Sequence, residues 1–193
     1  RGYFCLEQPN LDLNEIFQRY QDIFGGKFQT ECNVDIFRSV LRELRHDIEA
    51  DSEISNLFAG VHVPFILPKK EILEIEGDSV EILIQKVGVS FQNMFPDYSF
   101  RNLLGFDIKS VLGTDPESRW NKLEAAWQKS TLVGWYFPTA LAGFAIPDQV
   151  KTLGRLPEAL ILSGVLEVSA ALIGTPNLLM KSDGKYPNLL ALT

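Results

Sequence analysis

Residues 130–147 read STLVGWYFPTALAGFAIP, and no charged side chain interrupts them between Lys129 and Asp148. A helix that crosses a membrane needs about 20 predominantly apolar residues, whereas Ser, Thr, Gly and Pro are scattered through this stretch. Pro138 would also break a continuous helix, because proline has no N–H and its ring clashes with the preceding turn. We therefore predict a buried core segment that is broken into two pieces at Pro138, and no membrane span.

An aromatic triplet, Trp135-Tyr136-Phe137, lies inside this stretch, and Trp127 precedes it. Each large ring can bury about 150–250 Å², so packing in the core is one interpretation. The other is a docking surface or the wall of a ligand pocket, because Trp and Tyr contribute strongly to binding at interfaces. Both interpretations stay open, and these four residues are candidate binding residues.

The composition of the whole chain is typical of a globular protein. It has 193 residues, of which 46% are hydrophobic and 22% are charged. This predicts a single domain over 1–193, with 1–60 and 61–193 as possible sub-lobes. The net charge is −7, and nonspecific nucleic-acid binding depends on Lys and Arg that neutralise phosphates. We therefore expect no nucleic-acid partner.

The chain has only two cysteines, Cys5 and Cys32. Secreted domains that depend on disulfides usually contain more. The pattern favours free thiols in a reducing cytoplasm, which is the compartment we expect.

Apolar periodicity predicts a helix-rich α+β fold with about six helices and a few short strands, some of them at sheet edges. Clear helix starts follow Asn33 and Asp78, and another follows either Asn10 or Asp12. A last long helix is expected from Pro157 to about Ile173. The expected strands lie at residues 3–6 and 61–67, with a hairpin over 182–192. Pro64 cannot donate to a ladder, so it places the strand at 61–67 on an edge or at a bulge.

Arg38, Arg42 and Arg45 follow one flank of the helix expected after Asn33. Three arginines on one face could hold a phosphate or an acidic partner. Glu43 and Asp47 lie close by, however, and such mixed charge is typical of a solvated, salt-bridged face. The solvated face is the interpretation that we favour.

No catalytic, metal or cofactor motif is present in the sequence. Glu43 and His46 have the Glu-x-x-His spacing of di-metal bundles, but that chemistry needs a second such pair, and the other histidine, His62, has Ala59 in place of the acid. We expect no cofactor and no metal. Isolated candidates for catalytic chemistry remain, namely Cys5, Cys32, His46, His62 and Glu167.

Glu167 is the one charge inside the expected last helix. It lies either at the rim of the fold or as a buried carboxylate with a raised pKa, which is a type of group that marks sites.

These patterns favour a non-catalytic protein-interaction or regulatory module that acts through an apolar, aromatic surface, with a protein partner or a second copy of the chain. The alternative is a small apolar-ligand binding protein or an enzyme, with a pocket between the C-terminal helices and Glu167 as its polar group. The candidate binding residues are Trp127, Trp135, Tyr136, Phe137 and Glu167.

Overall fold

The computed structural model describes residues 6–25, 28, 31–75, 77–102, 119–141 and 143–180. Within these ranges the chain forms seven α-helices, two short 3-10 helices and one pair of antiparallel strands. The predicted class, a helix-rich α+β fold with few strands, is confirmed. The predicted hairpin and most of the strand predicted at 3–6 lie outside the described residues, and the division into sub-lobes stays a prediction.

The two strands, β1 (Val63–Leu67) and β2 (Leu132–Tyr136), form the sheet. Val63 pairs with Tyr136, and Leu67 pairs with Leu132. Every residue of β1 is buried, as its uncharged sequence leads one to expect. Pro64 lies inside β1, which is tolerated because each strand of a two-stranded sheet has one edge without a strand partner. The strand and edge position predicted for this segment are therefore confirmed.

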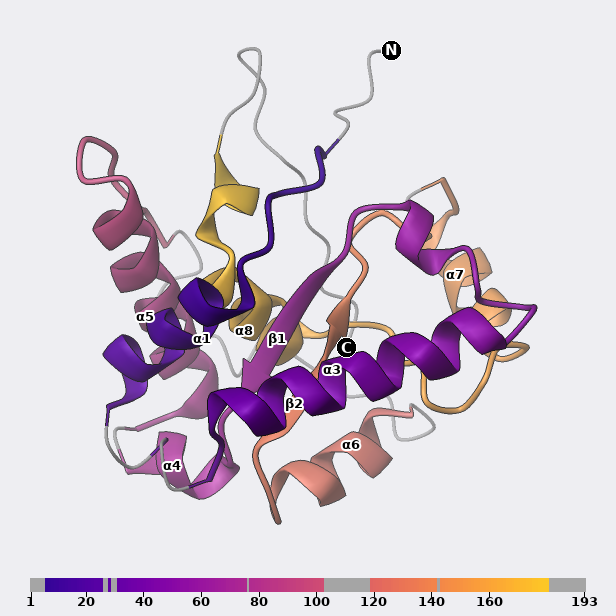
Figure 1. The fold of residues 1–193 in the computed structure, drawn as a ribbon, viewed down its shortest axis with the longest axis horizontal. Helices are drawn as coiled ribbons and strands as arrows, with labels where there is room; N and C mark the ends of the chain where they lie inside the picture. Colours follow the sequence, from indigo (N-terminus) through magenta and orange to yellow (C-terminus); the bar gives the residue numbers. More distant parts are fainter. Residues whose placement is uncertain are drawn as a thin grey trace.

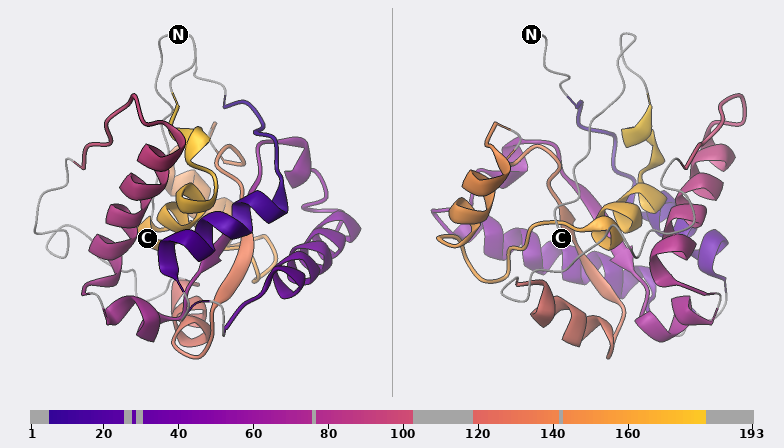
Figure 2. Two further views of the ribbon diagram at one scale, coloured as in Figure 1. Left: turned by 60° about the vertical axis from the view of Figure 1, so that its left-hand side comes forward. Right: turned by 180° about the vertical axis from the view of Figure 1, so that it is seen from behind.

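Helices cover both faces of the sheet. Figures 1 and 2 show α3 (Val34–Ala50) crossing in front of the strands and α8 (Val165–Gly174) lying behind them. α1 (Leu13–Phe24) and α5 (Ser79–Met94) both pack against α8. The largest fully buried side chains of this core include Ile16, Tyr20, Phe28, Phe37, Leu41, Ile66, Leu67, Leu73, Leu83 and Ile173.

Local capping explains where three of these helices begin. The carboxylate of Asp12 accepts hydrogen bonds from two backbone N–H groups in the first turn of α1, and Asp78 does the same for α5. The side-chain oxygen of Asn33 caps α3 in this way. Such caps satisfy N–H groups that have no partner within the helix. Gly25, with φ of 69°, ends α1, as the sequence predicts.

Tyr20 ties three elements together at the centre of the molecule. Its hydroxyl donates to the carbonyl of Ala170 in α8 at 2.7 Å and accepts from the backbone N–H of Ile66 in β1 at 3.2 Å. Complete burial raises the pKa of this phenol, so it stays neutral. The bond to Ile66 also satisfies a strand N–H that β2, the partner strand in the described part of the chain, leaves free.

The predicted start of the last helix is wrong, because α8 begins only at Val165. The preceding segment satisfies its carbonyl groups in another way. The guanidinium of Arg119 donates to three of them at 2.7–3.0 Å, namely those of Leu156, Pro157 and Leu160. Hydrogen bonds to these acceptors therefore do not require a helix.

The stretch 130–147 is only partly a core segment. Its first half forms β2, where Gly134 and Tyr136 are buried. After Pro138 the chain turns outward, and Phe144 is 51% exposed. The prediction of a break at Pro138 is confirmed, but burial of the second half is wrong.

The chain then enters α7 (Ile146–Leu153), a helix that the sequence analysis did not predict. α7 lies at one end of the molecule (Figure 1). Two further helices, α4 (Lys70–Glu74) and α6 (Trp120–Trp127), cover the opposite end of the sheet from the 3-10 helix at Leu57–Ala59. A second 3-10 helix, Pro176–Leu179, follows α8. Among the described helices, none has the length and apolarity that a membrane crossing requires.

Candidate functional site

Four rings meet where β1 begins and β2 ends. We call Phe58, His62, Trp135 and Phe137 the aromatic cluster. The Phe58 centroid lies 4.9 Å from that of His62 and 5.2 Å from those of Trp135 and Phe137, always edge to face. Edge-to-face contacts at such distances are favourable beyond the area that they bury. Each of the four side chains is only partly buried, so the cluster reaches the surface.

Polar contacts fix these rings in place. The indole N–H of Trp135 donates to the backbone carbonyl of Leu41 in α3 at 3.0 Å. Nδ1 of His62 lies 2.9 Å from the carbonyl oxygen of Gly60. The guanidinium carbon of Arg45 lies 4.7 Å from the Phe58 centroid, a cation–π contact. The cluster is thus connected to α3 by one hydrogen bond and one cation–π pair.

A groove of about 350 Å³ lies beside Trp135, and we call it the α3 groove. Its apolar lining is Leu13 from the start of α1, Leu41 from α3 and the Trp135 ring. Its charged lining consists of Arg38, Arg42 and Arg45, all from α3. No carboxylate of the described residues belongs to this lining.

The three arginines differ in their partners. Arg45 pairs with Glu49 at 2.7 Å. Arg38 donates to the side-chain oxygen of Asn14, which is neutral. Arg42 is exposed and has no hydrogen bond or ion pair with any described side chain. Arg38 and Arg42 therefore keep positive charges that no described carboxylate compensates.

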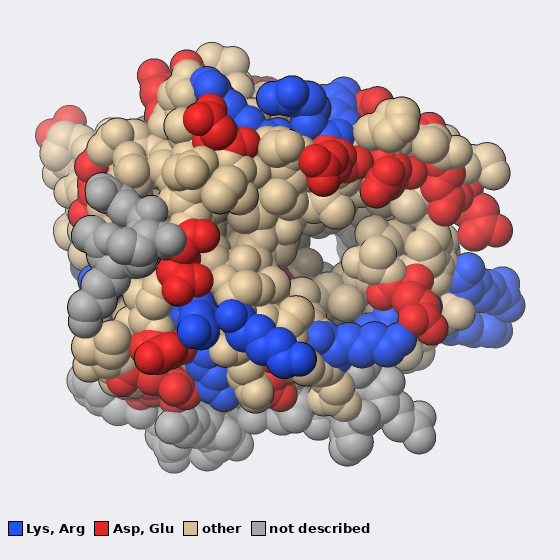
Figure 3. Space-filling view, turned by 60° about the horizontal axis from the view of Figure 1, so that its bottom comes forward, with Lys and Arg blue, Asp and Glu red and all other residues tan. Residues whose placement is uncertain are grey.

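Rows of like-charged side chains lie on one face of the molecule. Figure 3 shows one face on which Lys and Arg side chains form separate rows from Asp and Glu, around a hollow in the surface. Clustering of one sign strengthens the local potential that an approaching charged group meets.

Two of the predicted binding residues lie in the core. Trp127 is 2% exposed, and its N–H donates to the carbonyl of Pro68 at 2.6 Å. Tyr136 is also buried, and burial raises its pKa to about 12. Trp135 and Phe137 are the predicted aromatic residues that the structure brings together near the surface.

Glu167 is a buried carboxylate, as one of the two interpretations of the sequence has it. Its exposed fraction is 1%. One oxygen accepts from the indole N–H of Trp120 at 3.2 Å, and the other accepts from the backbone N–H of Gly164 at 2.8 Å. Burial raises the pKa of Glu167, and hydrogen bonds from the backbone and from Trp120 oppose this increase. Since each oxygen already caps or binds a protein group, the carboxylate has a structural role at the N-terminus of α8.

A larger cavity, of about 550 Å³, lies between α4, the start of α5 and α6. Its one Lys is Lys70, whose ammonium lies 3.8 Å from the Glu74 carboxylate and 3.6 Å from that of Glu124. It also lies 5.6 Å from the Trp127 ring centroid. Lys70 is thus already engaged by carboxylates of the protein, whereas Arg42 of the α3 groove has no described partner. The α3 groove is therefore the better candidate for binding an acidic partner, although it is smaller.

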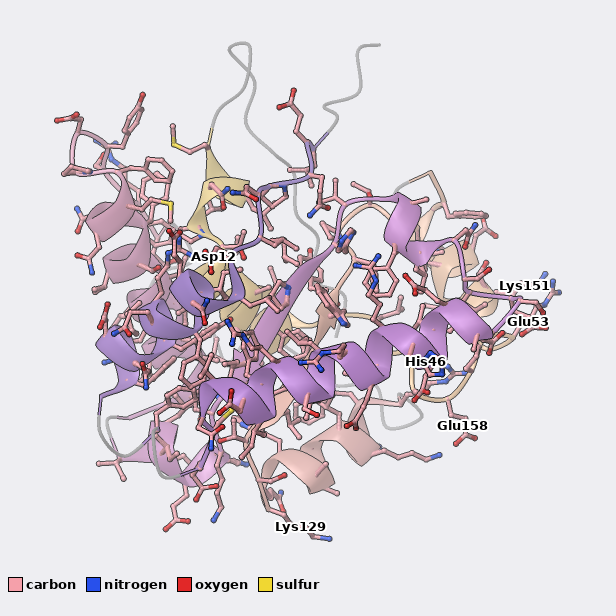
Figure 4. The ribbon with its side chains drawn as sticks, viewed as in Figure 1. Asp12, His46, Glu53, Lys129, Lys151 and Glu158 are labelled. Carbon is pink, nitrogen blue, oxygen red and sulfur yellow. The ribbon has the colours of Figure 1, made fainter. Side chains whose placement is uncertain are left out.

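The candidates for catalysis that the structure describes do not assemble into a site. Cys32 is buried, and burial raises its pKa to about 11, so the thiol stays protonated and weakly nucleophilic at neutral pH. His46 lies exposed on α3 (Figure 4), whereas His62 belongs to the aromatic cluster. Cys5 lies outside the described residues. Over the described ranges, no three metal-binding side chains come together.

No protein-family model, no curated protein and no solved structure matches this chain. Function must therefore be inferred from the aromatic cluster and the α3 groove. The sequence analysis found Trp135 and Phe137 but missed Phe58 and His62 as their neighbours. The one sequence signal for the groove is the spacing of Arg38, Arg42 and Arg45.

Proposed function

We propose that this chain is a non-catalytic protein-interaction module whose binding surface combines the aromatic cluster with the α3 groove. The observation that carries the proposal is Trp135, a half-buried ring that belongs to both and is held by its hydrogen bond to Leu41. Trp and Arg are enriched among the residues that dominate interface energies. A side chain that is already held in place also loses less freedom when a partner binds.

The small-ligand alternative has less support. Both oxygens of Glu167 are engaged by Trp120 and Gly164, which leaves this carboxylate without the role that the alternative gives it. Lys70 in the larger cavity is likewise paired with Glu74 and Glu124. A ligand would have to break these contacts before it could use the charged groups.

Affinity capture with matched variants tests the proposal. We expect Trp135→Ala and Phe137→Ala each to abolish capture of the same partner, with circular dichroism spectra that match the unchanged chain. Tyr98→Ala is the control, because this aromatic side chain is exposed beyond the end of α5 and touches neither surface. Loss of a hot-spot Trp typically costs about 2 kcal/mol or more of binding free energy. Unfolding of both cluster variants would instead assign these rings to the core and contradict the proposal.

The partner could be a second copy of the chain, and sedimentation velocity separates that case. If the chain self-associates through the aromatic cluster, Trp135→Ala converts the dimer to a monomer and Tyr98→Ala does not. A dimer that persists in both variants would place its interface elsewhere.

A further inference from the structure

The α3 groove combines basic and apolar side chains in one lining. Its charged lining is entirely basic, and its apolar lining is formed by Leu13, Leu41 and Trp135. A partner that supplied charge alone would leave the apolar lining against water. A partner that supplied only apolar groups would leave the guanidinium groups without the carboxylates that they bind best.

The unpaired arginines define the charge of the partner. Arg42 has no described partner, and Arg38 contacts only the neutral Asn14. Arginine binds carboxylates through two parallel N–H···O hydrogen bonds. Arg45 already has a carboxylate, because its Nε donates one hydrogen bond to Glu49, whereas Arg38 and Arg42 have no described carboxylate partner.

The apolar lining of the α3 groove defines the uncharged part of the partner. The Trp135 N–H is occupied by Leu41, so the ring offers its apolar surface and no free donor. The volume of about 350 Å³ accommodates one or two side chains, not a folded element. An aliphatic or aromatic anchor on an extended or helical segment fits this space.

We infer that the partner binds through a short acidic segment in which carboxylates flank a large apolar side chain. This inference rests on the proposed function and assigns the chemistry of its partner. The carboxylates pair with Arg38 and Arg42, and the apolar side chain lies against Leu41 and Trp135.

A nucleic acid fits this surface less well. Its backbone carries phosphates at regular short intervals, so it would extend past the groove over Glu43, Asp47 and Glu49 on the same helix. The net charge of the chain, −7, adds to this repulsion. A short peptide can place its carboxylates at the arginines alone.

The test uses a fluorescein-labelled peptide in which a Leu-Phe pair is flanked on each side by Asp and Glu, with fluorescence anisotropy as the readout. We expect saturable binding that weakens with rising salt, because salt screens exposed charge pairs. Arg42→Glu should weaken binding about tenfold or more. Lys129→Glu makes the same change of charge at the end of α6, where the side chain points away from the molecule (Figure 4), and should leave affinity unchanged.

Three results would overturn the inference. If a peptide with Ala in place of the Leu-Phe pair bound with equal affinity, the apolar side chain would not contribute to binding. If a single-stranded oligonucleotide of equal charge bound more tightly than the peptide, the arginines would be a nucleic-acid site instead. Absence of peptide binding, while Trp135→Ala and Phe137→Ala still abolish partner capture, would reject the acidic segment and leave the proposed function standing. Arg42 is exposed and without a described partner, so its variant should remain folded, and thermal unfolding checks this.

Discussion

Gly174 at the end of α8 leaves room for the Tyr20 hydroxyl. A Cβ at position 174 would lie 2.7 Å from that oxygen, too close for two non-bonded atoms. We expect Gly174→Ala to lower the free energy of unfolding by about 1–3 kcal/mol, because it displaces a buried hydroxyl from its hydrogen bonds to Ala170 and Ile66. Urea denaturation measures the change.

A double-mutant cycle makes that prediction specific. In a Tyr20→Phe background the hydroxyl is gone, but the ring carbon Cε2, which lies 2.8 Å from the added Cβ, remains. The cost of Gly174→Ala should therefore shrink only in part. Gly143→Ala serves as the control, because no atom lies within 4 Å of its added Cβ. An equal cost at position 174 in both backgrounds would show that the hydroxyl is not the cause.

Glu167 gives the chain a pH dependence of predictable sign. Burial raises its pKa above the ordinary value of 4.5, so the folded chain holds this proton more tightly than the unfolded chain. The contribution of Glu167 to stability is therefore highest below pH 4.5 and declines as pH rises through the folded pKa. We expect the stability of the unchanged chain, minus that of Glu167→Gln, to fall from acidic to neutral pH.

Glu158 provides a comparison of opposite sign. Its hydrogen bond to Lys122 lowers its pKa, so any stability that this exposed pair supplies is present above the ordinary pKa and is lost on acidification. The difference between the unchanged chain and Glu158→Gln should be small, because the pair is solvated, and should not fall as pH rises. Equal slopes in both comparisons would contradict the assignment of Glu167 as the buried, proton-retaining carboxylate.

Arg119, the residue just before α6, binds the segment that precedes α8. Arg119→Ala removes donors from the carbonyls of Leu156, Pro157 and Leu160. We expect a loss of about 1–3 kcal/mol, with faster amide hydrogen exchange confined to residues near these carbonyls. Arg119→Lys should recover little, because one ammonium cannot reproduce the planar fork of a guanidinium. Arg101→Ala is the control, because this side chain is exposed. If hydrogen exchange in the segment before α8 rose equally in this control variant, the prediction would be rejected.

The Arg119 contact also shows why some helix starts can be predicted from the sequence and others cannot. The starts of α1, α3 and α5 were predictable, because Asp12, Asn33 and Asp78 cap N–H groups only two or three residues away. The true start of α8 was not, since Arg119 and its acceptors lie far apart in the sequence. A helix and an extended segment with satisfied carbonyls cannot be told apart by apolar content alone.

The candidate site divides in the same way. The uncharged stretch pointed to Trp135, but the neighbours of this ring are Phe58 and His62, more than 70 residues earlier in the chain. Arg42 was predicted to be solvated because carboxylates lie close to it along α3, and it is indeed exposed. Its place in a groove depends on β2, which the sequence does not position relative to α3.

At the scale of the whole molecule, the core joins the two predicted sub-lobes. Tyr20 belongs to the first, while Ile66 and Ala170, which it bonds, belong to the second. We expect one cooperative unfolding transition, with tryptophan fluorescence and far-ultraviolet circular dichroism giving the same midpoint. All three tryptophans lie in the second sub-lobe. A fluorescence midpoint that differs from the circular dichroism midpoint would therefore reveal independent folding of the two parts.

The pairing of β1 with β2 constrains how the chain is made. Leu67 and its partner Leu132 lie 65 positions apart, so at about 5–20 residues per second the ribosome needs roughly 3–13 s to deliver the second strand after the first. During that interval β1 has no strand partner. Its sequence, Val63–Leu67, is an uncharged run of strand-forming residues, so it can associate with other nascent chains. Pro64 lies inside this run and has no backbone N–H, so an intermolecular strand pairing would lack one hydrogen bond. Pro64 weakens the ladder of β1, and for the same reason it disfavours intermolecular strand pairing during translation.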